Sequence, residues 1–379
     1  MTDALMVTSS FLPGRGGIES YLAELCDELA PRIAVLAAGR REGTPLPGDL
    51  PYLTIPFPGR LVVPGPRAAR SVIDHARRLE VDRVLFGTPW PLSLMAPKLR
   101  DAGLSYGVIV HGAELLVPAA VPVVGGRLAA ALAGADVIVA VSEFTARKVQ
   151  DLLDRKGYGS RSVPVLRARV DLDRFKPGSA EVDVRRRHAI ADEARIVLCF
   201  GRLVRRKGIH RLIEALPTIR SAVGEVVVVV VGTGPELRRL RRLTEKKQVP
   251  VVFAGRVPDA DAPSYYAGAD VFALPVVDRY RGLEVEGLGV VLLEAAASGV
   301  PSVTGRSGGT PEAVLHGRTG FVVDAADPLE LADAIVRLLR DERSARSMGE
   351  AGRAHVADAF ARGTFPDELM RWLGKGRTI

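Results

Sequence analysis

The sequence has few cysteines, no long apolar run and no leader-like start, and each shortage excludes a class of protein. Only Cys26 and Cys199 are cysteines among the 379 residues, so a disulfide framework and a cysteine-rich metal site are both excluded. No stretch approaches the ~20 consecutive apolar residues that a membrane-spanning helix needs. The first eight residues lack the basic start and long apolar core of a secretory signal. We therefore expect a cytoplasmic protein.

Aromatic residues are also scarce, at 5%, whereas the net charge is +8. An excess of positive charge favours an anionic partner, which can be nucleic acid, an anionic membrane surface or a phosphorylated small molecule. Proteins that bind single-stranded nucleic acid combine basic grooves with aromatic residues on which bases stack. No such motif is present, so we expect no nucleic-acid partner.

Short β-branched runs alternate with helical patterns along almost the whole chain. Continuous apolar runs such as 226–231 are typical of strands that are buried on both faces of a parallel sheet. The expected strands are 5–8, 33–37, 83–86, 107–110, 137–141, 163–166, 196–200, 226–231, 251–254, 271–274, 301–304 and 321–323. The expected helices include 19–30, 142–153, 209–219 and 235–246.

This alternation, repeated twice, predicts an α/β protein with two Rossmann-like, doubly wound domains that face each other across a cleft. We place the domains at 1–170 and 171–355, and we expect the helical tail 356–379 to pack back on the first domain. Ligands of such sheets bind outside the carboxyl ends of the strands. The residues that follow each strand are therefore the candidates for function.

The segment from Glu286 to Glu294 places two carboxylates eight residues apart around a Gly-x-Gly turn that opens an apolar helix. The backbone N–H groups of Leu288, Gly289 and Val290 would lie at the helix N-terminus, which favours a phosphate. The segment fits a nucleotide whose hydroxyls bind the carboxylates, or an ordinary capped helix with two solvated glutamates. Spacing alone favours the ordinary helix.

A basic loop, Gly201-Arg-Leu-Val-Arg-Arg-Lys-Gly208, follows the expected strand 196–200. Arg202 and Lys207 would lie at the carboxyl end of that strand, where fixed cations can hold a diphosphate. A basic surface turn explains the loop alone equally well. The diphosphate interpretation gains support from the two glutamates, because both segments follow strands of the same domain.

Two further loops of the second domain follow strands. Gly232 and Gly234 allow a tight turn near a ligand, although a purely structural role is equally well supported. Arg256 and Val257 follow the next strand and could border a nucleobase.

In the first domain, Gly16 and Gly17 lie in a loop that resembles a phosphate-contacting glycine loop but lacks the G-x-G-x-x-G pattern. His111 follows the strand 107–110. A lone histidine is more often structural than catalytic, but its place at a strand end favours a functional role.

Together these motifs resemble glycosyltransferase family 4, a family of retaining enzymes with the GT-B fold. The resemblance covers nearly the whole chain. It rests on Gly16-Gly-Ile-Glu, His111-Gly, Gly201-Arg…Lys-Gly208, Gly232-Thr-Gly-Pro, Glu286-x7-Glu294 and Ser307-Gly-Gly-Thr-Pro-Glu312. It implies that the first domain binds the acceptor and that the second binds a nucleotide sugar.

The resemblance also implies a role for each side chain. Arg202 and Lys207 would hold the donor diphosphate, and Glu294 would bind the ribose hydroxyls. Glu286 would contact the donor sugar. His111 would contact the sugar near the reacting carbon, and Gly17 would approach the donor phosphate or the acceptor.

Stretches such as Leu283-Glu-Val-Glu-Gly-Leu-Gly and Leu203-Val-Arg-Arg-Lys-Gly look like those of actinobacterial mannosyltransferases that act on phosphatidyl-myo-inositol mannosides. That likeness implies a GDP-mannose donor, a glycolipid or small-molecule hydroxyl acceptor, and neither a metal nor a cofactor. One position departs from the family, because Arg169 stands where its members commonly have glycine. The departure leaves the acceptor open.

The resemblance implies transfer with retention, without a covalent glycosyl–enzyme intermediate. Two alternatives stay open: a UDP-sugar-dependent transferase with a soluble acceptor such as a natural product, and a sugar-nucleotide epimerase. A non-catalytic binding protein is least favoured. No Asp-x-Asp metal motif stands at a strand end, since Asp171-Leu-Asp173 lies near the domain linker.

A basic segment of the first domain is a candidate membrane contact. Arg67, Arg70, Arg77 and Arg78, with Arg60 before them, surround apolar residues in a helical pattern. A solvated helix face is favoured about two to one over peripheral binding to the inner face of the cell membrane.

Overall fold

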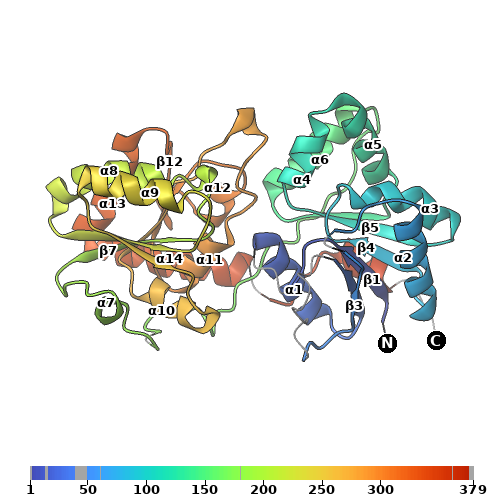
Figure 1. Ribbon diagram of the computed structural model, residues 1–379, viewed down its shortest axis with the longest axis horizontal. Helices are drawn as coiled ribbons and strands as arrows, with labels where there is room; N and C mark the ends of the chain where they lie inside the picture. The colour runs from blue at the N-terminus through green and yellow to red at the C-terminus, as the bar shows by residue number, and fades with distance from the viewer. Residues whose placement is uncertain are drawn as a thin grey trace. The chain divides into compact units, whose positions relative to one another are not determined.

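The computed structural model describes residues 2–12, 16–38, 49–59, 61–179, 181–360 and 362–374. The chain divides into two compact units (Figure 1). The first runs up to Ala168 and also includes the stretch that begins at Gly363, and the second is Arg169–Arg362. The corresponding limits predicted from the sequence are 170 and 355.

The first unit is built on a six-stranded parallel sheet in the order β3-β2-β1-β4-β5-β6. Its strands are β1 Ala4–Thr8, β2 Ile33–Ala37, β3 Thr54–Pro56, β4 Arg83–Phe86, β5 Ser105–Val110 and β6 Val137–Ala140. Its helices are α1 Gly17–Leu29, α2 Pro66–Arg78, η1 Leu92–Met95, α3 Ala96–Asp101, α4 Ala113–Ala119, α5 Pro122–Ala133, α6 Glu143–Arg155 and α15 Asp367–Gly374.

The second unit is built on a six-stranded parallel sheet in the order β12-β11-β10-β7-β8-β9. Its strands are β7 Arg195–Phe200, β8 Val226–Val231, β9 Val251–Gly255, β10 Val271–Leu274, β11 Ser302–Gly305 and β12 Gly320–Val323. Its helices are α7 Val184–Arg187, η2 Arg205–Lys207, α8 Ile209–Val223, α9 Leu237–Lys247, η3 Asp259–Asp261, α10 Ala262–Ala267, η4 Tyr280–Gly282, α11 Val290–Ala297, α12 Thr310–Ala313, α13 Pro328–Arg340 and α14 Glu342–Ala359.

The two sheets have the same strand order. Counted from the first strand of each unit, both read 3-2-1-4-5-6, which is the doubly wound Rossmann arrangement. The order reverses between β1 and β4 in the first unit and between β7 and β10 in the second. Such switch points are where open parallel sheets bind ligands. The expected fold class of two doubly wound domains is confirmed.

The buried strands follow from their composition. The strand β8 consists entirely of valine, and it pairs in parallel with β7 from Arg195↔Val226 to Phe200↔Val231. β-Branched side chains suit a pleated surface that is covered on both faces. In the second unit, α8, α9 and α13 cover one face of the sheet, and α10, α11 and α14 lie on the other (Figure 1).

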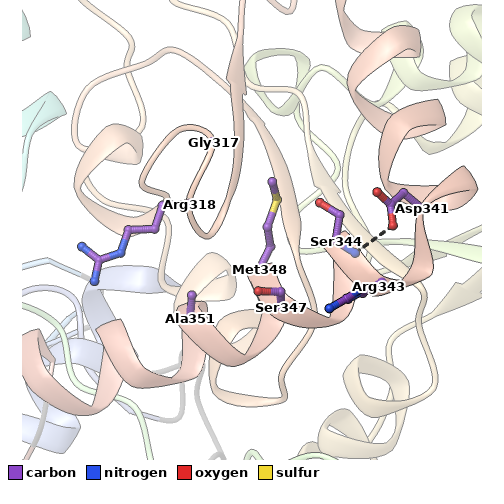
Figure 2. Close-up of a pocket in the computed structure, with 8 residues that line it drawn as sticks. All are labelled: Gly317, Arg318, Asp341, Arg343, Ser344, Ser347, Met348 and Ala351. Atoms are coloured by element: carbon purple, nitrogen blue, oxygen red, sulfur yellow. Dashed lines mark hydrogen bonds between the residues drawn. The ribbon is translucent and has the colours of Figure 1, made fainter.

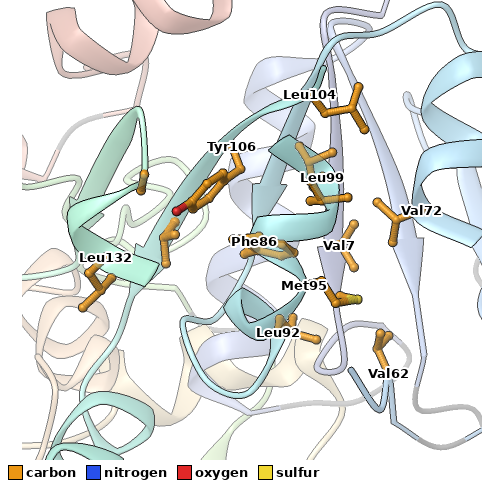
Figure 3. Packing of buried hydrophobic residues seen from close by; sticks show 14 of the residues in the cluster. Val7, Val62, Val72, Phe86, Leu92, Met95, Leu99, Leu104, Tyr106 and Leu132 are labelled. Carbon is orange, nitrogen blue, oxygen red and sulfur yellow. The ribbon is translucent and has the colours of Figure 1, made fainter. Parts of the chain in front are cut away.

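The core of the first unit is an apolar cluster between sheet and helices (Figure 3). Phe86 of β4 is fully buried, and its ring lies 5.9 Å from that of Tyr106 of β5. Val72 brings α2 into the same cluster, and Leu99 brings α3. Cys26 and Cys199 are both free thiols buried in the two cores, as expected of small core residues.

Two differences from the expected strands have simple reasons. Residues 163–166 form no strand, because only Val165 makes an isolated bridge, to Ala140. The strand β3 was not expected, since it has only three residues, is partly exposed and carries a proline. A short edge strand of this kind has too few residues to show a periodic pattern.

The stretch that begins at Gly363, after α14, belongs to the first unit. The helix α15 buries Leu369, Trp372 and Leu373. A Cβ atom at Gly107 of β5 would lie 2.7 Å from Val137 of the neighbouring strand and 3.2 Å from the Trp372 ring, so glycine makes room for both. Among the described residues, no helix combines the length and apolar character needed to cross a membrane.

Candidate active site

Backbone hydrogen bonds join the loop after β7 to the loops after β8 and β10 in the second unit. The N–H of Leu203 donates to Thr233 (2.9 Å), which joins the loops after β7 and β8. Val277 after β10 donates to the carbonyl of Arg206 (2.9 Å). The basic loop 201–208 and the segment that contains Glu286 therefore lie side by side at this edge of the sheet.

Glycines make these close approaches possible. Gly208 has φ +68°, and a Cβ atom there would lie 1.7 Å from the carbonyl oxygen of Pro275. Gly232 has φ +130°, and a Cβ atom would lie 1.9 Å from the carbonyl oxygen of Gly201. At Gly234 it would lie 2.3 Å from the Leu203 carbonyl. The backbone of these loops is thus packed at distances that no side chain permits.

Glu286 lies where the basic loop meets the loop after β10. Its side chain accepts a hydrogen bond from Arg206, and its Oε2 lies 2.8 Å from Nζ of Lys207. Glu286 and Lys207 are 9% and 8% exposed. The N–H of Glu286 donates to Oγ of Ser307 (2.9 Å), so the Ser307-Gly-Gly-Thr motif fixes the backbone of the glutamate.

The charge of Glu286 is set by these partners. Burial by itself raises the pKa of this carboxyl, but Lys207 and Arg206 outweigh burial and hold the pKa below its usual value. Glu286 is therefore an anion at neutral pH. With Glu284 beside Arg206 and Arg279 beside Glu284, the cluster holds three cations and two carboxylates, and this net positive charge suits an anionic ligand.

Glu294 lies inside α11, and its surroundings differ. The hydroxyl of Tyr266 donates a hydrogen bond to its Oε2. Tyr266 is itself fully buried, and its ring stacks on Phe200 with the centroids 5.2 Å apart. Burial raises the pKa of Glu294, and the hydrogen bond from Tyr266 lowers it only in part.

The turn between the two glutamates opens α11 as expected. Gly289 is the residue before the helix and has φ +86°, a left-handed conformation that suits glycine. Val290 is the first helical residue, and Leu288 is buried at 4% exposure. The first N–H groups of a helix have no partner within it and point out of its N-terminus. This end of α11 therefore presents donors next to Glu286.

Three other candidates of the second unit lie at strand ends. Arg202 follows β7 and is exposed, and Arg256 follows β9 and is also exposed. Val257 is half-buried beside it. Among the described residues, the Arg202 side chain has no hydrogen bond or ion pair, so its charge is available to a ligand.

His111 lies at the carboxyl end of β5 in the first unit and is 8% exposed. Its Nε2 lies 2.9 Å from the carbonyl oxygen of Gly87, so Nε2 carries the proton. The Tyr21 ring meets the imidazole edge to face, with the centroids 5.1 Å apart. Burial lowers the pKa of His111, so the ring is neutral near pH 7.

The glycine loop of the first unit is only partly described. Gly14 and Arg15 lie outside the described residues. Gly16 precedes the first residue of α1, which is Gly17. A Cβ atom at Gly17 would meet no atom of the described residues within 4 Å.

Family models match both halves of the chain. The model described as "Glycosyltransferase Family 4" matches residues 15–173, and the model described as "Glycosyl transferases group 1" matches residues 182–355. A relative from Mycobacterium tuberculosis is 37% identical over 388 aligned residues, which cover 98% of each chain. The protein belongs to glycosyltransferase family 4.

The names of two relatives are specific. The Mycobacterium tuberculosis protein is named "GDP-mannose-dependent alpha-(1-6)-phosphatidylinositol monomannoside mannosyltransferase". A protein of the same name from Mycolicibacterium smegmatis is 38% identical and aligns over 93% of this glycosyltransferase and 94% of its own length.

Solved structures support the GT-B fold. Sucrose-phosphate synthase from Thermosynechococcus elongatus has a TM-score of 0.78 at 21% identity and covers 95% of both chains. Anabaena Alr3699/HepE in complex with UDP-glucose has a TM-score of 0.76 at 19% identity and covers 99% of both chains. At these identities the likeness extends to the fold alone.

The structure adds two side chains to the candidate site that the sequence did not indicate. Arg206 pairs with Glu286, and Tyr266 bonds Glu294. Arg206 directly precedes Lys207, and only the turn η2 makes both side chains face one carboxylate. Tyr266 is 28 residues from Glu294 in the sequence, so no local pattern connects them.

The described part of the second unit also has a cavity of about 520 Å³ away from this site (Figure 2). Arg318 and Gly317 line it from the turn that precedes β12, and Ser344 and Met348 line it from α14. That turn lies at the amino end of β12, whereas the candidate residues follow strands. The cavity is therefore not the candidate donor site.

Arg169, the departure from the family pattern, is buried at 3% exposure.

Within the described ranges, no group of three or more His, Cys, Asp or Glu side chains is placed to hold a metal ion.

Proposed function

We propose that this glycosyltransferase moves mannose from GDP-mannose to a hydroxyl of a phosphatidylinositol mannoside. The observation that supports this proposal most directly is the buried ion pair of Lys207 and Glu286. It lies at the same edge of the sheet as the N-terminus of α11. The names of relatives that align over nearly the whole chain support the donor and the acceptor.

In the proposed reaction, Lys207 and Arg202 bind the donor diphosphate and stabilise the charge that develops as it leaves. A fixed charge aimed at such a site is worth roughly 3 kcal/mol. The departing diphosphate accepts the proton of the acceptor hydroxyl, which attacks from the same face of the sugar, so the configuration is retained. Glu286 contacts the sugar hydroxyls and Glu294 the ribose. Neutral His111 contacts the sugar near the reacting carbon.

Calorimetric titration with GDP and with UDP, in a buffer that contains a chelator, tests the donor. We expect GDP to bind and UDP to bind at least tenfold more weakly. The second step is incubation with GDP-mannose and phosphatidylinositol mannoside, with the lipid product identified by mass spectrometry. GDP binding without a mannosylated lipid would limit the proposal to the donor.

A UDP-sugar donor with a soluble acceptor is the second candidate, because the fold is shared with Alr3699/HepE in complex with UDP-glucose. A preference for UDP in the titration would select it. Conversion of the donor sugar in the absence of any acceptor would instead indicate an epimerase.

A basic surface on α2 supports a further part of the proposal, contact with anionic lipid. Arg67, Arg70, Arg77 and Arg78 are all exposed on this helix. Just before it, Leu61 is 62% exposed and Val63 is 71% exposed, although Val62 between them is buried. Exposed apolar residues next to cations are typical of proteins that lie on a membrane surface.

Vesicle flotation tests this contact with neutral and with anionic lipid. Each arginine near an anionic surface contributes about 1 kcal/mol, so Arg67→Gln with Arg70→Gln should weaken binding at least tenfold. The matched control removes the same charge from α9 through Arg238→Gln and Arg242→Gln. Equal loss in both variants would show only a general charge effect, and binding that is indifferent to anionic lipid would refute the contact.

A further inference from the structure

A chain of alternating charges runs through the candidate site of the second unit. Nη1 of Arg279 lies 3.0 Å from Oε2 of Glu284, and Nε of Arg206 lies 3.7 Å from Oε1 of the same residue. Arg206 also pairs with Glu286, which pairs with Lys207 at 2.8 Å. The carboxylate of Glu286 thus contacts two cations, Lys207 and Arg206. Of these two, Arg206 is also held by a second carboxylate, that of Glu284.

The pair between Lys207 and Glu286 conflicts with the proposed role of the lysine. An ammonium that holds a diphosphate must share or give up its contact with the carboxylate. Glu286 is only 9% exposed, and a buried charge that loses its partner is strongly destabilised. Donor binding would therefore be opposed by Glu286 unless another cation stays with it.

We propose that Arg206 is a positioning residue that keeps Glu286 paired and in place when Lys207 turns to the donor diphosphate. The inference rests on the proposed role of Lys207 as a diphosphate ligand. Arg206 would act through Glu286 and would not touch the nucleotide.

The surroundings of Arg206 suit this role. A guanidinium is a planar fork that can serve two carboxylates at once, and here these are Glu284 and Glu286. The backbone carbonyl of Arg206 accepts a hydrogen bond from Val277 (2.9 Å). Glu284 is held in turn by Arg279, whose N–H donates to the carbonyl of Glu284 (3.0 Å). Arg206 is therefore fixed before any ligand arrives.

The neighbouring Arg205 provides a matched control. Its side chain turns to Glu236 at 3.6 Å and is 42% exposed, whereas the Arg206 side chain is 26% exposed. Arg205→Gln removes the same charge one residue away from the site without touching Glu286. It should change the affinity for GDP less than twofold.

The decisive experiment is a double-mutant cycle on the affinity for GDP, measured by calorimetry with Arg206→Gln, Glu286→Gln and the double variant. We expect Arg206→Gln to weaken GDP binding at least tenfold when Glu286 is present, because Lys207 must then stay with the carboxylate. In the Glu286→Gln background the same change should cost less than threefold. Arg206→Lys, which keeps the charge but not the fork, should fall in between.

A pH series separates positioning from a loss of structure. The charged groups that face Glu286 are Lys207 and Arg206, and the loop after β11 adds the hydroxyl of Ser307. Without Arg206 the carboxylate takes up a proton more easily. GDP affinity of Arg206→Gln, relative to the unchanged protein in the same buffer, should therefore recover as the pH falls from 8 to 5.5.

Two results would overturn the inference. Equal weakening by Arg206→Gln in both backgrounds would mean that Arg206 binds the phosphates directly. No weakening in either would mean that it plays no part in donor binding. If the melting temperature falls in Arg206→Gln but not in Arg206→Lys, the glutamine variant has a folding defect. The cycle is then measured with Arg206→Lys in place of Arg206→Gln.

The cycle does not depend on which base or sugar the protein prefers. If UDP binds and GDP does not, the proposed donor is wrong, and the same cycle is run with UDP. If neither nucleotide binds, the diphosphate role of Lys207 fails, and the inference about Arg206 fails with it. Failure of the cycle in a protein that binds GDP overturns the inference alone.

Discussion

Glu286 is buried and Glu294 is half-buried, and the surroundings of the two glutamates shift their pKa values in opposite directions. Glu286 faces Lys207 and Arg206, and its pKa lies below the usual value although burial by itself raises it. Glu294 faces the hydroxyl of Tyr266, and burial raises its pKa. The two cations outweigh burial at Glu286, whereas the hydrogen bond from the neutral Tyr266 hydroxyl does not outweigh burial at Glu294.

The difference suggests separate tasks for the two ends of the segment. A carboxylate that two cations favour in its ionised form can orient a sugar and hold the cations in place. A carboxyl that is paired with a tyrosine hydroxyl in an apolar setting is suited to exchange hydrogen bonds with other hydroxyls. Substitutions at Lys207, Tyr266 and Glu294 test these two tasks.

The largest effect is expected from Lys207→Ala, which removes one of the two cations beside Glu286. Turnover should fall at least tenfold, because a fixed charge at a developing anion is worth roughly 3 kcal/mol. Stability should change little, since Arg206 stays on the carboxylate. Steady-state rates with saturating GDP-mannose and urea unfolding measure the two quantities.

Lys246→Ala on the exposed face of α9 is the control for this change, and it should leave both quantities unaltered. Near-normal turnover in Lys207→Ala would refute the assignment of the lysine to the diphosphate.

Tyr266→Phe tests the other end of the segment. It removes a hydrogen bond inside the core and leaves Glu294 without that donor, which should lower the free energy of unfolding by about 1–3 kcal/mol. Urea unfolding at pH 7 measures the loss. Tyr158→Phe is the control, because that side chain is 49% exposed. Equal stability of the two variants would show that Tyr266 does not support Glu294.

Glu294→Gln keeps the shape of the side chain and is expected to have a smaller effect on donor binding. The affinity for GDP should fall about fivefold, roughly 1 kcal/mol, since hydrogen bonds to the ribose hydroxyls are weakened. Calorimetry with GDP and with its 2′,3′-dideoxy analogue separates this role. The analogue should bind both proteins equally, and a fivefold difference that persists with it would place Glu294 elsewhere.

The smallest effect is expected on the pH dependence of stability, from His111. Burial lowers its pKa in the folded state, whereas an unfolded histidine titrates near 6.5. Below that pH the unfolded chain binds the extra proton, so the free energy of unfolding falls with pH by at most ~1.4 kcal/mol per unit from this group. Urea unfolding of His111→Gln should show a shallower decline between pH 6.5 and 5.5. An unchanged slope would contradict it.

Much of the fold could be predicted, because each buried strand is a short β-branched run with a helical pattern after it. Strands β2, β4, β8 and β10 begin and end at the residues that the sequence indicates. The strand β3 could not be found, since three residues at a sheet edge carry no periodicity. The apolar run 163–166 predicts a strand, but it pairs only through Val165.

The candidate site was predictable only where chemistry is local in the sequence. Glu286 and Glu294 flank one turn, and the structure places that turn at the opening of α11. The partners of the two glutamates were not predictable. Arg206 is distinguished from Arg205 only by the direction its side chain takes from η2, and Tyr266 reaches Glu294 only through packing of α10 on α11. The roles assigned to the candidate residues stay predictions.

The glycines at the sheet edge have a consequence for how donor preference can change. A Cβ atom at Gly308 would lie 1.9 Å from the carbonyl oxygen of Glu286, as one at Gly232 would from that of Gly201. These glycines therefore cannot be replaced without moving the backbone, and a new donor specificity must arise from changes in the side chains around them. A library aimed at another nucleotide should hold these glycines constant and vary Arg256 and Val257 first.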